Sequence, residues 1–264
     1  MRQLTIFEWF GIQLPARDCY RLIRQAGFDG VLLWWDEVKH PDYKLRPALA
    51  RKEGLWVENA HMPFDNANNL WLDNAAGDDY AAQMLRWVDE CACFEIPVMV
   101  LHLALGWAPP PVNDKGMARL KRMVEHAENR GVRVALENLD TLGHLHHALD
   151  NIHSDALGFC FDAGHQNCRT PNDDLLPRHG NRLIALHLHD NDGFVTGAGP
   201  EDQHRLPFDG TINWPETMKK IKAAGYAGAI AQEALPTGHD DLLDKPEKFL
   251  ELAHDRAARL RGMS

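Results

Sequence analysis

Short apolar runs alternate with longer amphipathic segments along the whole chain. The short runs have the length and composition of buried β-strands, and they cover residues 3–9, 29–35, 55–60, 97–103, 132–137, 156–162, 182–189 and 228–233. The longer segments repeat apolar residues every three or four positions, which predicts helices near residues 15–26, 42–53, 75–94, 114–129, 141–150, 173–179, 215–224 and 246–261. This regular alternation of strand and helix predicts a parallel sheet covered by helices.

The number of strand–helix units indicates an α/β protein built as a (β/α)8 TIM barrel. Eight units within 264 residues match the usual size of that fold. A doubly wound open sheet is the alternative, but the turn after the first strand lacks the glycine pattern of dinucleotide-binding folds. Because the chain contains no linker or low-complexity segment, we expect residues 1–264 to form a single domain.

Net charge, apolar runs and cysteine content exclude several classes of binding partner. The formal net charge of −10 disfavours binding to nucleic acid or to an anionic membrane. No apolar run is long enough to span a bilayer, and the N-terminal segment does not look like a signal peptide. The five cysteines include no CxxC pair, which is typical of reduced thiols in the cytoplasm. We therefore expect a cytoplasmic protein with a small-molecule substrate and no membrane partner, and a homo-oligomer remains open.

Titratable side chains recur at the ends of the predicted strands. In the segment ALHLHD, His187 and His189 alternate with leucines, and alternate side chains of a strand point to the same face. The same alternation places one titratable residue at the C-terminal end of each of six strands, namely His61, His102, Glu137, Asp162, His187 and Glu233. In a TIM barrel these ends form one rim, and the active site lies there.

Several acids and imidazoles buried together require a compensating charge. A single histidine at such a position is more often a hydrogen-bonded core residue. Burying the whole set costs several kcal/mol for each unpaired charge. A bound cation removes that cost, and mixed oxygen and nitrogen ligands suit Mn²⁺, Mg²⁺, Co²⁺ or Zn²⁺. The sequence therefore predicts a metal site at the rim.

The alternation also suggests roles for the neighbours of these residues. It turns Asn59 inward as a substrate contact and Glu58 outward between strand and helices. His189 shares the inner face one layer below His187, where it would support a ligand rather than bind the metal. Asp190 would orient a ligand or bind substrate. Trp34, at the end of the second strand, suits stacking on a sugar ring and equally suits plain packing.

Four motifs resemble those of a known family. ALENLD, FDAGH, ALHLHD and AQEA are similar to the metal-binding strand ends of xylose-isomerase-like TIM barrels. That group includes sugar isomerases, ketose 3-epimerases, inosose-processing enzymes and endonuclease IV. The resemblance implies that one divalent ion is bound by Glu137, Asp162, His187 and Glu233. It also implies that Glu137 and Glu233 face the substrate from opposite sides as acid and base.

The implied reaction is proton transfer next to a carbonyl group. A divalent ion stabilises the enediolate that forms when a hydroxy-ketone loses a C–H proton. Return of the proton by a second group gives epimerisation or aldose–ketose isomerisation. In this interpretation His165 of DAGH contacts a substrate hydroxyl, and further substrate contacts come from Asn59, His61, His102 and His204.

Endonuclease IV uses the same barrel with three zinc ions and provides the alternative, a phosphodiesterase acting on abasic DNA. Mapped onto this chain, His61, His102 and Glu137 would bind one zinc ion. The second would be bound by Glu137, Asp162, His187 and Glu233, and the third by His165, Asp202 and His204. His61, His102, His165, Asp202 and His204 are therefore candidate additional metal ligands.

Three observations favour the isomerase or epimerase over the nuclease. Residues 62–74 contain no lysine or arginine and residues 103–116 contain only Lys115, whereas a DNA enzyme needs cations for phosphates. His102 is followed by LAL instead of a Pro-Gly turn. The Asn-rich segment 61–74, with Trp71, suits sugar hydroxyls and a sugar face.

Two further interpretations complete the predictions. A barrel without activity, or one that dehydrates an inosose-like ring, stays open, although the presence of Glu137 and Glu233 argues against loss of activity. The histidines of GHLHHAL at 143–149 are expected on a helix that faces mostly solvent, because their spacing alone is weak for a metal site.

Overall fold

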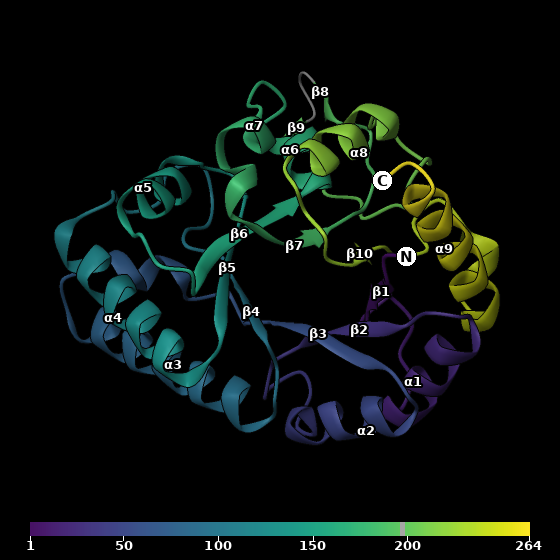
Figure 1. Cartoon of the computed structure of the whole chain (residues 1–264), viewed down its shortest axis with the longest axis horizontal. Helices are drawn as coiled ribbons and strands as arrows, with labels where there is room; N and C mark the ends of the chain where they lie inside the picture. Colours follow the sequence, from purple (N-terminus) through teal and green to yellow (C-terminus); the bar gives the residue numbers. More distant parts are fainter. Residues whose placement is uncertain (196–198) are drawn as a thin grey trace.

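Eight parallel strands close into a barrel (Figure 1). The computed structural model describes residues 1–195 and 199–264. The strands are β1 Leu4–Phe7, β2 Gly30–Trp34, β3 Trp56–His61, β4 Val98–Leu101, β5 Arg133–Glu137, β6 Leu157–Asp162, β7 Leu183–His187 and β10 Ile230–Gln232. Neighbours pair in the order β10-β1-β2-β3-β4-β5-β6-β7, and the Leu188 N–H donates to the Ala231 carbonyl across the remaining gap at 2.9 Å. The predicted TIM barrel is confirmed.

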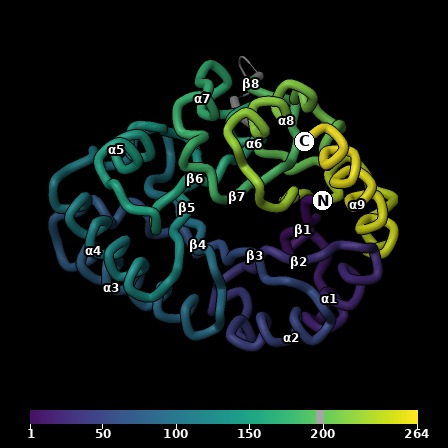
Figure 2. The backbone as a smooth tube through the Cα atoms, viewed as in Figure 1, coloured from purple at the N-terminus to yellow at the C-terminus, as the bar shows by residue number. Residues whose placement is uncertain are grey.

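Helices surround the barrel in the order that the sequence predicts (Figures 1 and 2). They are α1 Ala16–Gln25, α2 Arg46–Lys52, α3 Ala75–Cys93, α4 Asp114–Arg130, α5 Gly143–Asn151, α6 Ala163–Arg169, α7 Leu175–His179, α8 Trp214–Ala223 and α9 Pro246–Arg261. Short 3₁₀ turns occur at η1 Tyr43–Leu45, η2 Ala67–Trp71, η3 Gly180–Arg182 and η4 Asp240–Leu242, and two short strands, β8 Phe194–Val195 and β9 Gly199–Pro200, pair with each other. Helix α6, η2 and the β8–β9 pair were not predicted.

Small side chains fill the barrel interior below the C-terminal ends of the strands. Val98, Val100, Ala135, Cys160 and Ala185 form a core cluster separate from the larger core between strands and helices. On β5, β6 and β7 the next inward position after Ala135, Cys160 and Ala185 is Glu137, Asp162 and His187 respectively. Strand periodicity therefore places these three polar side chains directly above a cluster of apolar side chains.

A register shift in β3 changes the orientation predicted for one acid. The pairing of β2 with β3 skips Glu58, because Val31 is opposite Val57 and Leu32 is opposite Asn59. Glu58 is buried and its carboxylate accepts a hydrogen bond from the Thr5 hydroxyl of β1. The prediction that Glu58 packs between strand and helix was therefore wrong, because a bulge interrupts strict alternation. Burial raises the pKa of Glu58 to about 7.

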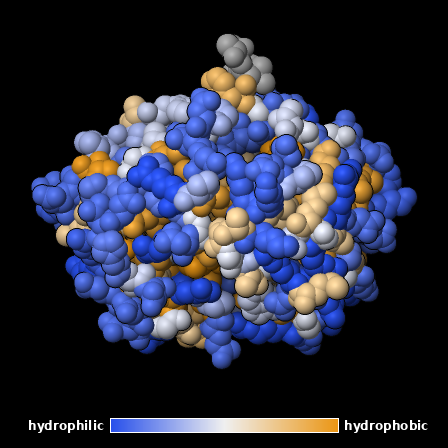
Figure 3. Space-filling view, turned by 45° about the horizontal axis from the view of Figure 1, so that its top comes forward, coloured by the Kyte–Doolittle hydropathy of each residue, from blue (hydrophilic) through white to orange (hydrophobic). Residues whose placement is uncertain are grey.

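One face of the molecule is mostly polar, and the two chain ends lie close together. The face in Figure 3 is mostly hydrophilic, with apolar residues scattered over it. The described helices include none whose length and apolarity would allow it to cross a membrane. The Arg261 guanidinium donates to the Arg2 carbonyl at 3.4 Å, so α9 returns to the start of β1.

The histidines of α5 are less exposed than their spacing predicts. His144 is buried and bonded to the Pro110 carbonyl, and His146 Nδ1 lies 2.8 Å from His179 Nε2 of α7. Of the three histidines of GHLHHAL, His147 is the one that faces solvent. The expectation of a mostly solvent-facing group was wrong for His144 and His146, because α7 and the β4–α4 loop cover this helix.

The His146–His179 pair makes stability depend on pH. Burial and the neighbouring His146 lower the pKa of His179 to about 4, so the folded protein favours the neutral ring. The contribution of His179 to the free energy of unfolding is then fully present above the unfolded-state pKa of about 6.5, and it is lost as the pH drops toward 4. At pH 5 we expect a loss of about 2 kcal/mol through this residue. Urea unfolding at pH 7.5 and 5.0 should show that loss in the parent and not in His179→Gln. The exposed His147→Gln is the control, and an equal loss in all three proteins would contradict the prediction.

Candidate active site

A cavity of about 330 Å³ opens at the C-terminal ends of the strands. Its polar lining includes seven of the predicted site residues, namely His61, His102, Glu137, His165, Asp202, His204 and Glu233. Asp162 and His187 lie beneath them and have no exposed surface. The rim therefore brings the predicted residues together in two layers, of which the upper one meets the cavity.

Glu137 is the centre of the upper layer. Its Oε2 lies 3.1 Å from His61 Nε2, 3.2 Å from His102 Nε2 and 3.2 Å from His187 Nδ1. Its Oε1 lies 3.1 Å from His165 Nδ1. Burial alone would raise the pKa of Glu137, but His187 and His102 hold it well below the usual range. The carboxylate is therefore charged and surrounded by imidazoles from three strand ends and from α6.

The four predicted metal ligands converge on one point. Glu137, Asp162, His187 and Glu233 each offer one ligand atom, and these atoms lie within 4.8 Å of one another. Among the residues that the structure describes, Glu137 Oε1, Glu233 Oε2 and both ring nitrogens of His187 are buried without a hydrogen-bond partner. Buried polar atoms without a partner are costly, and one shared cation can satisfy both carboxylate oxygens and one of the two His187 nitrogens. The donor set fits a divalent ion.

Three histidines are oriented as metal ligands usually are. His61, His165 and His204 place Nδ1 within 3.0 Å of a backbone carbonyl, those of Met62, Asn138 and Glu233 respectively. A carbonyl oxygen only accepts, so each Nδ1 carries a proton, and the ring turns its Nε2 toward a carboxylate. For His61 that carboxylate is Glu137, and for His165 and His204 it is Asp202. A proton on Nε2 satisfies such a contact, and a bound metal ion can take the place of that proton.

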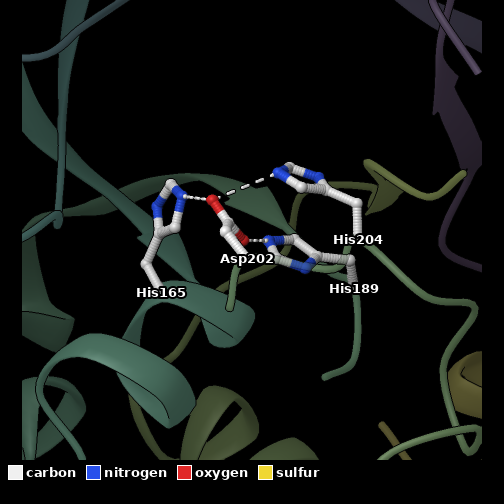
Figure 4. A group of neighbouring side chains, drawn as sticks. All are labelled: His165, His189, Asp202 and His204. Atoms are coloured by element: carbon white, nitrogen blue, oxygen red, sulfur yellow. Dashed lines mark hydrogen bonds and ion pairs between the residues drawn. The ribbon is translucent and has the colours of Figure 1, made fainter. Parts of the chain in front are cut away.

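A second group of ligating side chains lies beside the first (Figure 4). His165 Nε2 and His204 Nε2 lie 2.9 and 3.4 Å from Asp202 Oδ2, and His189 Nε2 lies 3.8 Å from Asp202 Oδ1. His189 Nε2 is also 3.1 Å from Asp162 Oδ1, which belongs to the first group. His189 was predicted to support a ligand, and its contact with Asp162 has that geometry. Its place within reach of Asp202 was not predicted.

Opposite charges in the second group reinforce one another. Burial opposes charge on His165, but Asp162 and Asp202 raise the pKa of its imidazole well above the ordinary value. Asp202 likewise raises the pKa of His204 to about 9, against the effect of burial. The same histidines hold the pKa of Asp202 below its usual range. At neutral pH, protons on these rings therefore supply the positive charge that the carboxylate requires.

Local backbone features hold this second group in place. Asp162 caps α6, because the His165 N–H donates to its Oδ1 at 2.6 Å, so one carboxyl group starts the helix that carries His165. A Cβ on Gly164 would lie 2.0 Å from His189 Cε1, which explains the glycine of DAGH. His204 has φ +46°, a conformation rare for non-glycine residues, and the Leu235 N–H donates to its carbonyl at 2.6 Å.

Three predicted contacts do not reach the cavity. Asn59 is fully buried, and the described lining of the cavity does not include it. Asp190 is also buried, and its carboxylate accepts from Trp214 Nε1 at 2.7 Å and from the Phe208 N–H at 3.0 Å. It therefore organises the loop after β7 instead of binding substrate. Trp71 is buried and donates to the Leu103 carbonyl at 2.7 Å, so it packs the β4–α4 loop.

Comparison with known proteins supports the fold and the motifs. The family model described as xylose isomerase-like TIM barrel matches residues 20–251. The chain belongs to this family.

Named relatives of this xylose isomerase-like chain include both characterised and uncharacterised proteins. It is 34% identical over 145 residues to the uncharacterised protein y4fM of Sinorhizobium fredii, a match that spans 52% of this chain and 44% of that protein. It is 25% identical over 154 residues to an inosose isomerase of Halalkalibacterium halodurans, covering 50% of this chain and 55% of that enzyme. The solved structure of an L-ribulose 3-epimerase shares the fold, with a TM-score of 0.76, 15% identity and coverage of 99% and 96% of the two chains.

Apart from Trp34, sequence reasoning missed the apolar wall of this xylose isomerase-like site, and it also missed one ion pair. The remaining lining residues are Phe7, Trp9, Trp34, Phe64, Leu105, Leu139, Asp140, Arg169 and Leu235. Phe7 ends β1 and could have been found from its place in the strand. Arg169 was not predicted to line the cavity, because the helix that carries it, α6, was not predicted. It pairs with Asp140 and lies 3.3 Å from Asp202, so its charge is already balanced.

Proposed function

We propose that this protein is a divalent-metal-dependent isomerase or epimerase of a sugar, ketose or inosose-like hydroxy-ketone. One observation carries the proposal. Of the four residues proposed to bind the ion, Glu137 and Glu233 line the cavity, whereas Asp162 and His187 are buried below it. Two of the ligands are thus placed to exchange protons with a substrate. The names of the inosose isomerase relative and of the L-ribulose 3-epimerase with the same fold agree with this class.

Each group of side chains in the cavity has its own role in the proposed reaction. A bound divalent ion would polarise the carbonyl and hydroxyl oxygens of the substrate. Glu137 and Glu233 remove and return the proton of the adjacent C–H group. His187 lies 2.8 Å from Glu233 Oε2 and 3.2 Å from Glu137 Oε2, and so holds both carboxylates in position. The apolar wall, with Trp34 and Phe64, packs on the sugar ring and excludes water.

A three-zinc phosphodiesterase is the second candidate, and one observation favours it. The group of His165, His189, Asp202 and His204 has the ligand geometry of a further metal site. The charge of the cavity opposes this candidate. Among the described lining residues Arg169 is the one arginine or lysine, and Asp140 and Asp202 already balance it. Phosphodiester backbones need free cations, so the isomerase or epimerase is the better fit.

Metal content separates the two candidates. We expect one tightly held divalent ion per chain in protein purified without chelator, measured by elemental analysis before and after dialysis against Mn²⁺ or Zn²⁺. The rate of isomerisation or epimerisation of ketoses and inososes should rise and fall with the content of bound ion. Three zinc ions per chain, together with cleavage of an abasic DNA duplex, would overturn the proposal.

Metal binding should release protons. In the metal-free protein Cys160, Glu233 and Glu137 raise the pKa of His187 well above its ordinary value, although burial opposes this. A metal ligand must be the neutral imidazole, so the ion displaces that proton. Affinity should therefore rise as the pH increases from 6 to 9. Titration calorimetry in buffers of different ionisation enthalpy measures the protons released. Binding that is independent of both pH and buffer would contradict this arrangement.

A further inference from the structure

A second cavity lies beside the catalytic one on the same rim. Its volume is about 350 Å³, close to the 330 Å³ of the catalytic cavity. Its walls come from the β1–α1 and β2–α2 segments, with Gln13 and Leu14 on one side and Lys39 and His40 on the other. Trp9 and Trp34 line both cavities. The two spaces are therefore neighbours that share two indole rings.

Trp34 is a fixed ring between the two cavities, and Trp9 is an exposed ring that borders both of them. Trp34 stacks on His61 with ring planes 9° apart, and Lys39 Nζ lies 4.8 Å from its ring centroid. The Trp34 indole N–H donates to Asp36 at 3.1 Å, which fixes the ring as the wall. Trp9 is 41% exposed although it is a large aromatic residue. An open indole that borders both spaces is a surface on which one ligand can extend from the first cavity into the second.

The floor of the second cavity is rigid and electrically balanced. Glu8 is buried, accepts from the Trp34 N–H at 2.7 Å and pairs with Arg46 at 2.9 Å. Arg46 also pairs with Asp42 at 3.1 Å. Among the described lining residues, Lys39 is the lysine or arginine without a carboxylate partner. One lysine is a weak site for a phosphate group, which favours several donors in a fork.

The lining suits an uncharged sugar unit. Ile12, Leu14 and Trp9 offer apolar contact to a ring face, and Gln13 and Lys39 offer donors and an acceptor to hydroxyls. The catalytic cavity is at the lower end of the range for small-ligand sites, about 300–1,000 Å³, so it suits a single ring. A second ring would then lie across Trp9 in the neighbouring space.

We propose that the second cavity binds a sugar unit joined by a glycosidic bond to the hydroxy-ketone in the catalytic cavity. The substrate class is then a glycosylated hydroxy-ketone instead of a free monosaccharide. This inference rests on the proposed function, because it takes the first cavity as the place of the reacting ring. Trp9 and Gln13 are the residues that determine this specificity.

Four glucosyl-fructoses that differ only in linkage test the inference. Isomaltulose, leucrose, maltulose and turanose are titrated against the purified metal-containing protein by calorimetry, with fructose and glucose as references. At least one disaccharide should bind ten times more tightly than fructose. Gln13→Trp fills the second cavity and should reduce that gain to less than twofold, and Trp9→Ala should reduce it as well. Gln83→Trp, on α3 outside the described lining of both cavities, should keep the gain.

The outcomes separate this inference from the proposed function. Equal or weaker binding of all four disaccharides, or a gain that survives Gln13→Trp, overturns the second site. Epimerisation of a free ketose in that same case would leave the proposed function intact. Conversely, a Trp9- and Gln13-dependent gain without turnover of any ketose or inosose supports the second site and contradicts the proposed function.

Discussion

Replacing Glu233 or Glu137 by glutamine should lower the epimerisation rate by about 10²–10⁴-fold. Glutamine keeps the shape of the side chain but cannot accept the substrate proton. Both carboxylates line the cavity, and neighbouring histidines keep each of them ionised against the effect of burial. His187 and His204 hold the pKa of Glu233 at about 2. The measurement is epimer formation together with deuterium uptake from D₂O at the reacting carbon.

The two variants should differ in which epimer still exchanges. With one carboxylate intact, the epimer on that side can lose and regain its proton without inversion. Each variant should therefore exchange one epimer and fail to exchange the other. Metal content is measured alongside, because both residues are also proposed ligands. The exposed Glu125→Gln on α4 is the control. Unchanged epimerisation in both variants would show that these carboxylates do not move the proton.

Arg46→Met should destabilise the protein by about 3–5 kcal/mol, because it leaves Glu8 buried without its cation. The Glu8 side chain is 1% exposed and the Arg46 side chain 10%. Their ion pair of 2.9 Å joins the residue that follows β1 to the first residue of α2. Burial already raises the pKa of Glu8, and Arg46 opposes that rise. For a chain of this size, the corresponding shift in melting temperature is about 10 °C.

A double variant identifies the cause of this loss. Arg46→Met combined with Glu8→Gln removes the uncompensated charge and should recover much of the stability. Arg21→Met is the matched control, because its pair with Asp18 has a similar length, 3.1 Å, but both side chains are about half exposed. We expect it to change stability by less than about 1 kcal/mol. A double variant no more stable than Arg46→Met would assign the loss to packing instead of charge.

The strand ends were predictable because their signal is local. Alternation of apolar and polar residues needs only one strand, and closure of a parallel barrel then brings every C-terminal end to one rim. Glu137, Asp162, His187 and Glu233 converge for this reason. The same rule failed at Glu58 and Asn59, where the register shift between β2 and β3 interrupts the alternation. A bulge depends on the neighbouring strand and left no mark that we could detect in the sequence of β3.

Helix α6 shows a different limit. It starts at the residue after β6, without a loop, and Asp162 serves both as its cap and as a proposed ligand. Without a loop, no turn residues mark where the strand ends and the helix begins. Arg169, which α6 carries into the cavity, was missed as a consequence.

The sequence by itself determined the class of fold, the order of its elements and which residues end each strand, because periodicity and turn chemistry act over a few neighbours. Only the tertiary structure decided the distances between these side chains and which residues line each cavity. His189 lies within 3.8 Å of Asp202, and Trp9 and Trp34 each line both cavities. Such pairs form between loops whose paths depend on packing of the whole barrel, and pairwise distance across a closed sheet is not encoded in any local pattern.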